Sequence, residues 1–353
     1  MIERICLLCF FSSFRPMVSR QTPGDDLVWG NSHFSWGDEK GCSWLCVYDN
    51  VPQGWTTTIP KHRRILVVVE PKAIMHYTPD CLAQYGTVLS PYVRPASYEG
   101  RWVNAPILFP WLYGVYGFKE HNVTRKYATW DALKKPKTNK TKLLSVIQRN
   151  KGFSKTQLQR SRFIQSLLDI FGRKTVYLNS KADGIDAYRY HLALENDTGP
   201  HFWSEKLADC YLGEAYPIHA GCPNLSDYFP PQAYTAIDIF NIPQAIQRVK
   251  EVIVSDLWRD NRSYILEAKR RVMEEHQLLP VIDRVIRSAD KTAYQPLTRP
   301  VPLKAGDVNE KPQYNSIPEP RNMKDLCRKY GRKDYYISRY YTLRHSIKKR
   351  LPF

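Results

Sequence analysis

The sequence lacks a long apolar run, a histidine cluster and any internal repeat. No segment approaches the roughly 20 apolar residues that a membrane-spanning helix needs. Nine histidines are present, and none of them completes a zinc site with the close cysteine pairs Cys6/Cys9 and Cys42/Cys46. A chain of 353 residues is too long to need disulfide staples, so we expect most of its eight cysteines to be reduced thiols in a cytoplasmic protein.

Acidic residues are also in the minority. Asp and Glu number 34 against 52 Lys and Arg, which gives a formal net charge of +18. Such an excess indicates either a solvated basic surface or an anionic partner, for example nucleic acid, acidic lipid or a phosphorylated ligand. No recognisable nucleic-acid motif accompanies the charge, so we do not expect nucleic acid as the partner.

The apolar pattern divides the chain into two α/β regions. In residues 1–130 the run ILVVV (Ile65–Val69) predicts a strand buried on both faces, and short strands are expected at 5–14, 87–89 and 106–108. The polar, basic stretch 131–142 predicts a linker. In residues 143–290 strands alternate with helices expected from Ser154 and at 205–212, 242–253 and 262–279, which predicts a parallel sheet with crossover helices.

Residues 291–353 form a basic, tyrosine-rich tail. From Arg321 to Phe353 it holds eleven Lys and Arg against two Asp. Apolar and aromatic residues fall at helical spacing, which predicts a basic amphipathic helix; they are Tyr336, Tyr340, Leu343 and Ile347. That helix would either lie on an anionic membrane surface or pack on the second domain with its charges in water.

Two candidate sites follow from the rule that ligands bind at the carboxyl ends of parallel strands. Glu70 comes directly after ILVVV, and the segment 195–206 comes directly after HLAL. Ser204 can cap a helix beginning at Glu205, and a helix N-terminus suits a phosphate. A cation such as Lys206 in the first turn is disfavoured by the helix dipole unless an anion lies opposite. From spacing alone, a first turn that merely faces water is the favoured interpretation, because a lone Ser-Glu-Lys is a weak signal.

The same segment resembles a known family. YRYHLALEN followed by FWSEKLADCYLGEAYPIHAGCP is similar to the donor-binding signature Y-K-F-x-L-x-x-E-N, a loop and Y-x-T-E-K of the α1,3/α1,4-fucosyltransferases, glycosyltransferase family 10. The spacing from Asn196 to Lys206 matches the bacterial-type members without a gap. The similarity extends over about 143–279, and FSWGDEK, ILVVVEP and RWVNAPILFPW resemble earlier family segments in the same order.

The resemblance implies a GT-B fold of two Rossmann-like domains, with the acceptor side in 1–130 and a GDP-fucose site mainly in 143–290. It implies that Arg160 and Lys206 hold the diphosphate and that Glu205 contacts the ribose. Further pocket residues are expected to be Asn196, Phe202 and Ser204. Phe202 stands where the family has Tyr, and Ser204 where it has Thr, which leaves the choice of nucleotide sugar open.

The expected chemistry is transfer of fucose with inversion. Glu70 would act as general base for a hydroxyl of a glycan or lipid-linked saccharide, with an α1,3 linkage to a GlcNAc- or Glc-type unit as the expected product. Two cations facing the phosphates would make a divalent metal or other cofactor unnecessary. Weaker candidates for acceptor contacts are Trp36, Asp38 and Glu39, which could equally form a surface turn.

Other functions stay open at this point. They are a transferase for another nucleotide sugar, a non-catalytic glycan- or membrane-binding relative, and a nucleic-acid binder supported only by charge. With no anchor or stem in the sequence, we expect a cytoplasmic enzyme, peripheral on the inner face of the membrane if the tail binds lipid.

Overall fold

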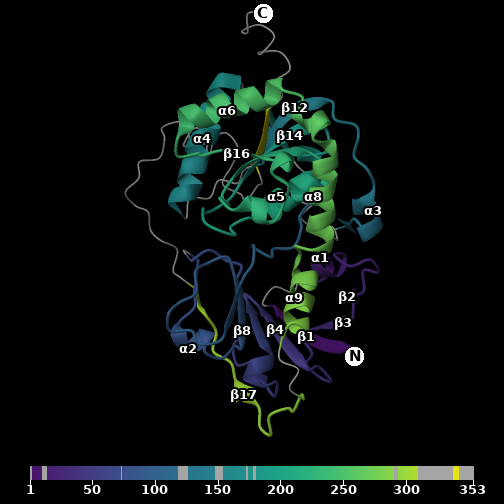
Figure 1. Ribbon diagram of the computed structural model, residues 1–353, viewed down its shortest axis with the longest axis vertical. Coiled ribbons are helices and arrows are strands. Elements are labelled where there is room, and N and C mark those ends of the chain that lie inside the picture. Colours follow the sequence, from purple (N-terminus) through teal and green to yellow (C-terminus); the bar gives the residue numbers. More distant parts are fainter. Residues whose placement is uncertain are drawn as a thin grey trace, which may run out of the picture.

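Two largely parallel β-sheets, one above the other in Figure 1, organise the chain. The computed structural model describes residues 2–9, 14–72, 74–117, 126–147, 154–171, 174–177, 180–289, 293–308 and 337–341. The lower half in the figure carries the first sheet, and the upper half the second. The predicted two-domain α/β architecture is therefore confirmed.

The first sheet has seven strands in the order β2-β3-β1-β4-β6-β8-β9, and only the β2–β3 pair is antiparallel. Their bounds are β1 (Glu3–Cys9), β2 (Val28–Trp29), β3 (Ser32–Trp36), β4 (Trp44–Tyr48), β6 (Arg64–Val67), β8 (Thr87–Ser90) and β9 (Arg101–Asn104). Alternate residues of β1 enter two different buried clusters, Ile5 on one face and Cys6 on the other. Burial on both faces explains the unbroken apolar runs of β1 and β6.

The second sheet has six strands in the order β13-β19-β12-β14-β15-β16. Their bounds are β12 (Lys142–Val146), β13 (Lys174–Tyr177), β14 (Tyr188–Leu194), β15 (Tyr216–Ala220), β16 (Thr235–Ala236) and β19 (Ile337–Tyr341). Strands β12, β14, β15 and β16 run parallel, as expected for crossover connections through helices. Short two-stranded pairs add β5 (Thr56–Thr57) with β17 (Val301–Pro302), β7 (Met75–His76) with β18 (Asp307–Val308), and β10 (Val115–Tyr116) with β11 (Lys126–Tyr127).

The helices of the second domain follow the predicted pattern closely. The longer helices are α4 (Lys155–Phe171), α5 (Glu205–Leu212), α6 (Ile242–Val254), α8 (Arg262–Glu274) and α9 (Leu278–Arg287). Short ones are α1 (Arg15–Ser19), α2 (Pro79–Leu82), α3 (Trp130–Lys134), α7 (Leu257–Asp260) and the 3₁₀ turns η2 (Lys61–Arg63), η3 (Lys181–Gly184), η4 (Leu225–Asp227) and η5 (Pro231–Ala233). The Ser204 side chain caps α5 as predicted, by accepting a hydrogen bond from Lys206 N.

Three predicted elements differ from the structure. The helix expected over 262–279 ends at Glu274, and the chain restarts as α9, which packs on the first sheet rather than within the predicted second domain. Its apolar face meets Ile5 and Leu7, so a surface of the first domain decides its position. No strand forms at 106–108, because Ile107 N donates to Trp203 O across the domains instead. The predicted linker 131–142 begins inside helix α3.

The tail does not form the predicted helix where the structure describes it. Residues 301–308 pair with the first domain through β17 and β18, and Ile337–Tyr341 forms β19, antiparallel to both β12 and β13. Over Ile337–Tyr341, strand pairing thus takes the place of the helix that the sequence spacing predicts. The rest of the predicted basic helix lies outside the described residues.

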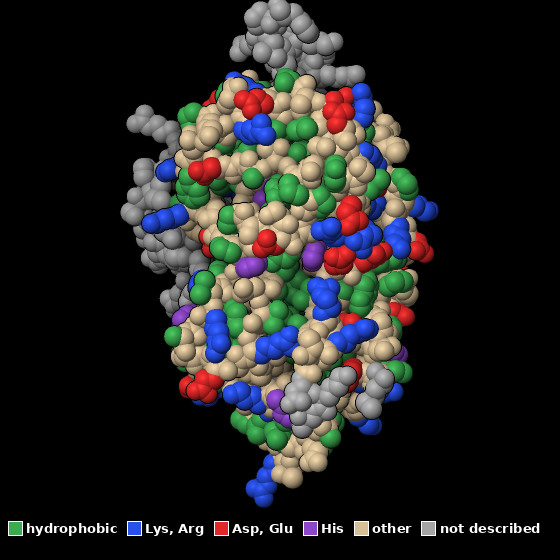
Figure 2. All heavy atoms as spheres, viewed as in Figure 1, with side chains coloured by type: hydrophobic (Ala, Val, Ile, Leu, Met, Phe, Trp, Pro, Cys, Tyr) green, Lys and Arg blue, Asp and Glu red, His purple; other side chains and the backbone are tan. Residues whose placement is uncertain are grey.

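Among the described residues, basic and acidic side chains are mixed on the visible face, and the cysteines are free thiols. Lys and Arg side chains are spread over both halves of the face seen in Figure 2, with Asp and Glu among them. The seven cysteines that the structure describes are free thiols, as predicted, and Cys327 lies outside the described residues. Among the described residues, no helix is long and apolar enough to cross a membrane.

Two histidines in strands of the second sheet, His191 and His219, are buried. Ser145 Oγ lies 2.7 Å from His191 Nδ1, and His219 accepts a hydrogen bond from Cys222 N at Nε2. Burial lowers the pKa of His191 to about 3 and that of His219 to about 4. Both are therefore neutral structural residues at neutral pH.

These histidines predict a loss of stability in mild acid. The unfolded chain binds their protons near pH 6.5, whereas the folded chain does not, so stability rises with pH between about 4 and 6.5 and falls on acidification. Each can contribute up to about 1.4 kcal/mol per pH unit. Unfolding by denaturant at pH 4.5, 5.5 and 6.5 measures the slope. His219→Gln should flatten it, and the exposed His62→Gln should not; equal slopes in all three proteins would contradict this assignment.

Candidate functional site

A pocket of about 390 Å³ lies between the two domains. Its walls come from residues that follow parallel strands in both sheets: Phe14 after β1, Glu70 after β6, Ile147 after β12, and Glu195 with Asn196 after β14. In each sheet the first parallel strand has later strands on both sides, so the order in which strands are added reverses beside it. This switch point lies between β1 and β4 in the first sheet and between β12 and β14 in the second. The pocket therefore occupies the place where such sheets bind ligands.

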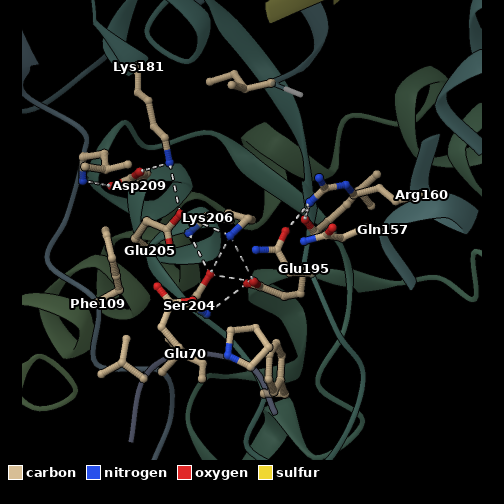
Figure 3. Close-up of a pocket in the computed structure, with 18 of the residues that line it drawn as sticks. Glu70, Phe109, Gln157, Arg160, Lys181, Glu195, Ser204, Glu205, Lys206 and Asp209 are labelled. Carbon is tan, nitrogen blue, oxygen red and sulfur yellow. Dashed lines mark hydrogen bonds and ion pairs between the residues drawn. The ribbon is translucent and has the colours of Figure 1, made fainter. Parts of the chain in front are cut away.

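The start of helix α5 is held by a buried carboxylate. Glu195 accepts hydrogen bonds from Ser204 N at 2.9 Å and from Ser204 Oγ at 2.6 Å, and its side chain is 1% exposed. Burial raises the pKa of Glu195, while the Lys206 ammonium 3.7 Å away works against that rise. Figure 3 shows these groups at the centre of the pocket wall. Glu195 therefore orients the α5 N-terminus and, with it, Lys206.

Glu205 and Lys206 form a contact pair at the first turn of α5. Lys206 Nζ lies 3.2 Å from Glu205 Oε1 and 3.3 Å from Ser204 Oγ. Burial alone would raise the pKa of Glu205, but the ammonium groups of Lys206 and Lys181 outweigh it and hold that pKa at about 2. Glu205 is thus an ionised acceptor, and Lys206, with its side chain 23% exposed, reaches the pocket.

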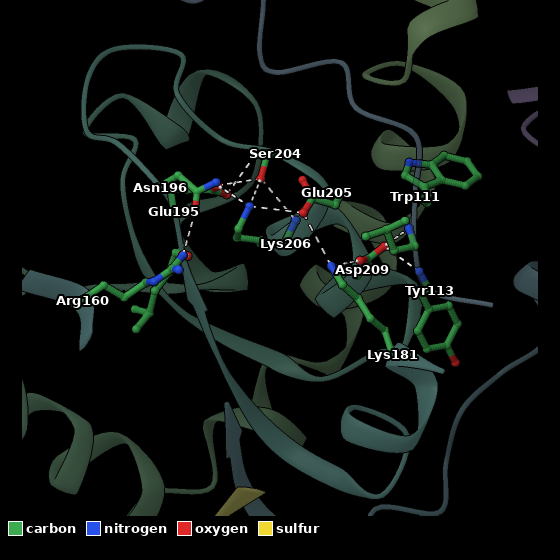
Figure 4. A network of polar contacts seen from close by, with 12 residues as sticks. Trp111, Tyr113, Arg160, Lys181, Glu195, Asn196, Ser204, Glu205, Lys206 and Asp209 are labelled. Atoms are coloured by element: carbon green, nitrogen blue, oxygen red, sulfur yellow. Dashed lines mark hydrogen bonds and ion pairs between the residues drawn. The ribbon is translucent and has the colours of Figure 1, made fainter. Parts of the chain in front are cut away.

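Lys181 extends this network deeper into the second domain. Its ammonium lies 2.7 Å from Asp209 Oδ2 and 3.6 Å from Glu205 Oε1. Burial works against the charged lysine, but Asp209 and Glu205 raise its pKa above the ordinary value. Figure 4 shows the resulting chain of contacts from Lys206 to Asp209.

Arg160 approaches the pocket from helix α4, on the other side of the α5 N-terminus. One guanidinium nitrogen donates to Asn196 Oδ1 at 2.8 Å and to Leu194 O at 3.2 Å. Burial lowers the pKa of Arg160, and the nearby carboxylates of Glu195 and Glu205 partly offset that lowering. Within the described part of the chain Arg160 has no carboxylate in ion-pair contact, and its buried Nε has no hydrogen-bond partner. It is therefore the pocket cation best placed to accept an added anion.

Glu70 faces this cluster from the first domain. Figure 3 shows it across the pocket from Arg160, with Ser204 between. Its backbone N–H donates to Asp49 Oδ1 at 3.0 Å, and the same oxygen accepts from Val69 N at 3.2 Å and from Tyr77 Oη at 2.6 Å. Asp49 has a φ of +66°, so a left-handed turn after β4 places its carboxylate beneath the end of β6. The Glu70 loop is thereby fixed.

The structure brings all seven main predicted site residues to one pocket, namely Glu70, Arg160, Asn196, Phe202, Ser204, Glu205 and Lys206. Phe202 is 3% exposed and packs on the apolar cluster of the first domain, with its ring centre 6.0 Å from that of Tyr92. Its ring therefore joins the domains as well as bordering the pocket.

The weaker acceptor candidates lie outside the pocket lining. Glu39 accepts hydrogen bonds from Thr57 Oγ1, Thr58 N and Thr58 Oγ1 at 2.7–3.1 Å, which ties it to a neighbouring loop. Asp38 accepts from Lys40 N at 2.9 Å, as a turn residue does. Trp36 packs at the edge of the first-domain cluster. An acceptor role for these three residues stays a prediction.

Sequence reasoning missed four residues that build the site: Asp49, Lys181, Glu195 and Asp209. Glu195 carried a signal, because it follows a buried strand within the family-like E-N pair. Asp209 lies four residues after Glu205 and so shares a helix face with it, which was a weaker signal. No feature of the sequence pointed to Lys181 or Asp49. Among the described residues, no group of three His, Cys, Asp or Glu side chains could hold a metal ion.

Fold and site together define two Rossmann-like domains that face each other across a pocket lined by both basic and acidic side chains. Parts of the chain are similar to curated fucosyltransferases. A 74-residue segment is 28% identical to the α-(1,3)-fucosyltransferase FucT of Helicobacter pylori, covering 21% of this chain and 16% of that protein. A 117-residue segment is 29% identical to the 4-galactosyl-N-acetylglucosaminide 3-α-L-fucosyltransferase FUT6 of Homo sapiens, covering 30% of this chain and 31% of that protein.

These matches span less than a third of either relative. No protein-family model matches the chain. Among solved structures, a crystal structure of α1,3-fucosyltransferase with GDP-fucose aligns with 83% of this chain and 92% of its own, at 12% identity and a TM-score of 0.45. A second, with GDP, aligns with 78% of this chain and 92% of its own, at 14% identity and a TM-score of 0.45.

Proposed function

We propose that this chain is an inverting fucosyltransferase that uses GDP-fucose, with Glu70 as its general base. One observation carries the proposal: a single interdomain pocket places Glu70 of the first domain opposite Arg160 and Lys206 of the second. The partial similarity to curated fucosyltransferases supports the choice of sugar. The donor-like segment 195–206, several residues of which line that pocket, also supports it.

The second domain binds the donor in this proposal. The diphosphate lies at the N-terminus of α5, where unpaired N–H groups favour anions, between Arg160 and Lys206. Arg160 contributes a planar guanidinium suited to two phosphate oxygens. Glu205, ionised by its lysine neighbours, accepts hydrogen bonds from the ribose hydroxyls.

The transfer step then proceeds as a single displacement. The acceptor oxygen attacks C1 of fucose on the face opposite GDP while Glu70 takes the hydroxyl proton. The bond from C1 to the β-phosphate oxygen breaks, and its electron pair leaves with GDP. Charge that develops on the diphosphate is stabilised by Arg160 and Lys206, which are already positioned before reaction. The new linkage has inverted configuration at C1, and the positive charge on the sugar ring resembles an oxocarbenium ion.

The proposed acceptor is a hydroxyl of a glycan or lipid-linked saccharide, with α1,3 linkage to a GlcNAc- or Glc-type unit. Two cations beside the diphosphate make a divalent metal dispensable in this proposal. The family-10, bacterial-type assignment rests on the ungapped spacing from Asn196 to Lys206.

A second candidate is a transferase for another nucleotide sugar. It rests on Phe202, whose ring is buried against the first domain and has no hydroxyl to offer a donor. Binding of GDP-fucose, GDP-mannose and UDP-galactose, compared by calorimetry, separates the two candidates.

Lys206→Ala tests the donor site directly. Removing the ammonium deletes a charge-assisted contact and leaves Glu195 and Glu205 without their shared cation. We expect GDP-fucose affinity to fall about 10- to 100-fold, the equivalent of about 1.5–3 kcal/mol. Calorimetry measures it, with the exposed Lys250→Ala on α6 as the matched control. Equal affinity in wild type and Lys206→Ala would remove the donor site from this pocket.

A further inference from the structure

Lys181 occupies an unusual place among the charged groups of the pocket. Its ammonium lies between two carboxylates, 2.7 Å from Asp209 Oδ2 and 3.6 Å from Glu205 Oε1. Glu205 Oε1 also receives Lys206, at 3.2 Å. One buried oxygen is therefore shared by two ammonium groups, of which Lys206 is the more exposed, at 23% against 14% for Lys181.

This sharing matters when an anion enters. A lysine that turns from a buried carboxylate toward a phosphate leaves that carboxylate uncompensated, which is costly in a low-dielectric site. Here the Glu205 side chain is only 11% exposed, but Lys181 remains beside it after Lys206 has turned away. Lys181 thus reduces the cost of releasing Lys206 from Glu205.

Asp209 holds Lys181 in that position and also binds the backbone of residues 112–113. Its Oδ1 accepts hydrogen bonds from Leu112 N and Tyr113 N, both at 2.9 Å, while Oδ2 accepts from Lys181. Leu112 also borders the pocket, so one buried carboxylate ties Lys181 to the backbone of residues 112–113.

We propose that Lys181 and Asp209 are positioning residues for diphosphate binding, which compensate Glu205 when Lys206 turns to the ligand. This inference rests on the proposed function, because it assigns the diphosphate to Lys206. It predicts that Lys181 acts through Lys206 rather than by touching the ligand.

Calorimetry with GDP tests the proposal in the full chain. Lys181→Met should weaken GDP binding about tenfold, the equivalent of one charge-assisted hydrogen bond. In a Lys206→Ala background the same change should have less than about a twofold effect, because the lysine through which it acts is gone. A tenfold effect in both backgrounds, or none in either, would overturn the proposal.

Two further variants separate positioning from simple stability. Lys269→Met breaks a lysine–carboxylate pair of the same 2.7 Å length, to Glu214, away from the pocket; it should lower the melting temperature but not GDP affinity. Lys181→Met/Asp209→Asn removes both charges of the pair and should recover melting temperature while GDP binding stays weak. Recovery of both would make the pair structural and overturn the proposal.

If wild type binds neither GDP nor GDP-fucose, the proposed function fails as well, whereas normal wild-type binding with unaffected variants overturns this inference alone.

Discussion

Glu70→Gln should reduce kcat for fucose transfer by about 10²–10⁴-fold, the usual contribution of a general base. Glutamine keeps the size and the hydrogen-bonding ability of the side chain but does not take the acceptor proton. The Asp49 contact to the Glu70 backbone is unaffected, so the loop should keep its position. Initial rates of GDP release with a saccharide acceptor measure the effect.

Donor affinity provides the control for this prediction. GDP-fucose binds the second domain in the proposed mechanism, so calorimetry should give the same dissociation constant for Glu70→Gln and wild type. Glu99→Gln, an exposed change in the same domain, should leave both rate and affinity unchanged. A Glu70→Gln variant that keeps wild-type turnover would require a different base.

Arg160→Lys should weaken GDP-fucose binding about 100-fold although it keeps the positive charge. Lysine does not reproduce the planar guanidinium that contacts two phosphate oxygens, and its shorter reach abandons the contacts to Asn196 Oδ1 and Leu194 O. Two lost hydrogen bonds to a charged group correspond to about 3 kcal/mol. Calorimetry with GDP-fucose and GDP measures the loss.

Helix α4 offers a matched control for that variant. Arg162 lies two residues further along the same helix and is exposed. Arg162→Lys should bind GDP-fucose as wild type does. If Arg160→Lys binds equally well, Arg160 serves only to hold the Asn196 loop, and the diphosphate contacts must come from elsewhere.

The charge balance of the pocket explains why Arg160 and Lys206 are expected to contribute differently. Lys206 is already compensated by Glu195 and Glu205, so its transfer to a ligand exchanges one ion pair for another. Arg160 has only neutral acceptors in the described part of the chain, so an anion adds a partner without removing one. The larger effect should therefore follow from Arg160.

Local sequence patterns predicted most of the framework. Unbroken apolar runs such as ILVVV predict strands buried on both faces, and the structure places β6 and β14 inside their sheets, each between two neighbouring strands. Helix α5 begins at the predicted Glu205 because its cap, Ser204, is a local signal. Strand-end position predicted Glu70, since parallel strands all end at the edge where the pocket lies.

The errors occurred where long-range packing outweighs local pattern. The sequence predicts that the residues of helix α9 belong to the end of the second domain. In the structure the apolar face of α9 is buried against the first sheet. The spacing of residues in the tail predicts a helix, but Ile337–Tyr341 forms a strand between β12 and β13. There it makes backbone hydrogen bonds to both strands, whose edges would otherwise be unpaired.

By itself the sequence determined the two α/β domains, the capped helix at Ser204 and the candidate positions Glu70, Arg160, Glu205 and Lys206. The domains, the helix cap and the positions of Glu70, Glu205 and Lys206 follow from local periodicity, capping and strand ends, which neighbouring residues specify. Arg160 was indicated by the family resemblance alone. Only the tertiary structure decided which charges meet. Lys181 reaches Asp209 because η3 and α5 pack together, and Asp49 underlies Glu70 because β4 and β6 are adjacent. Such contacts join residues more than 20 positions apart, and no local pattern encodes the pairing of one charged side chain with another at that distance.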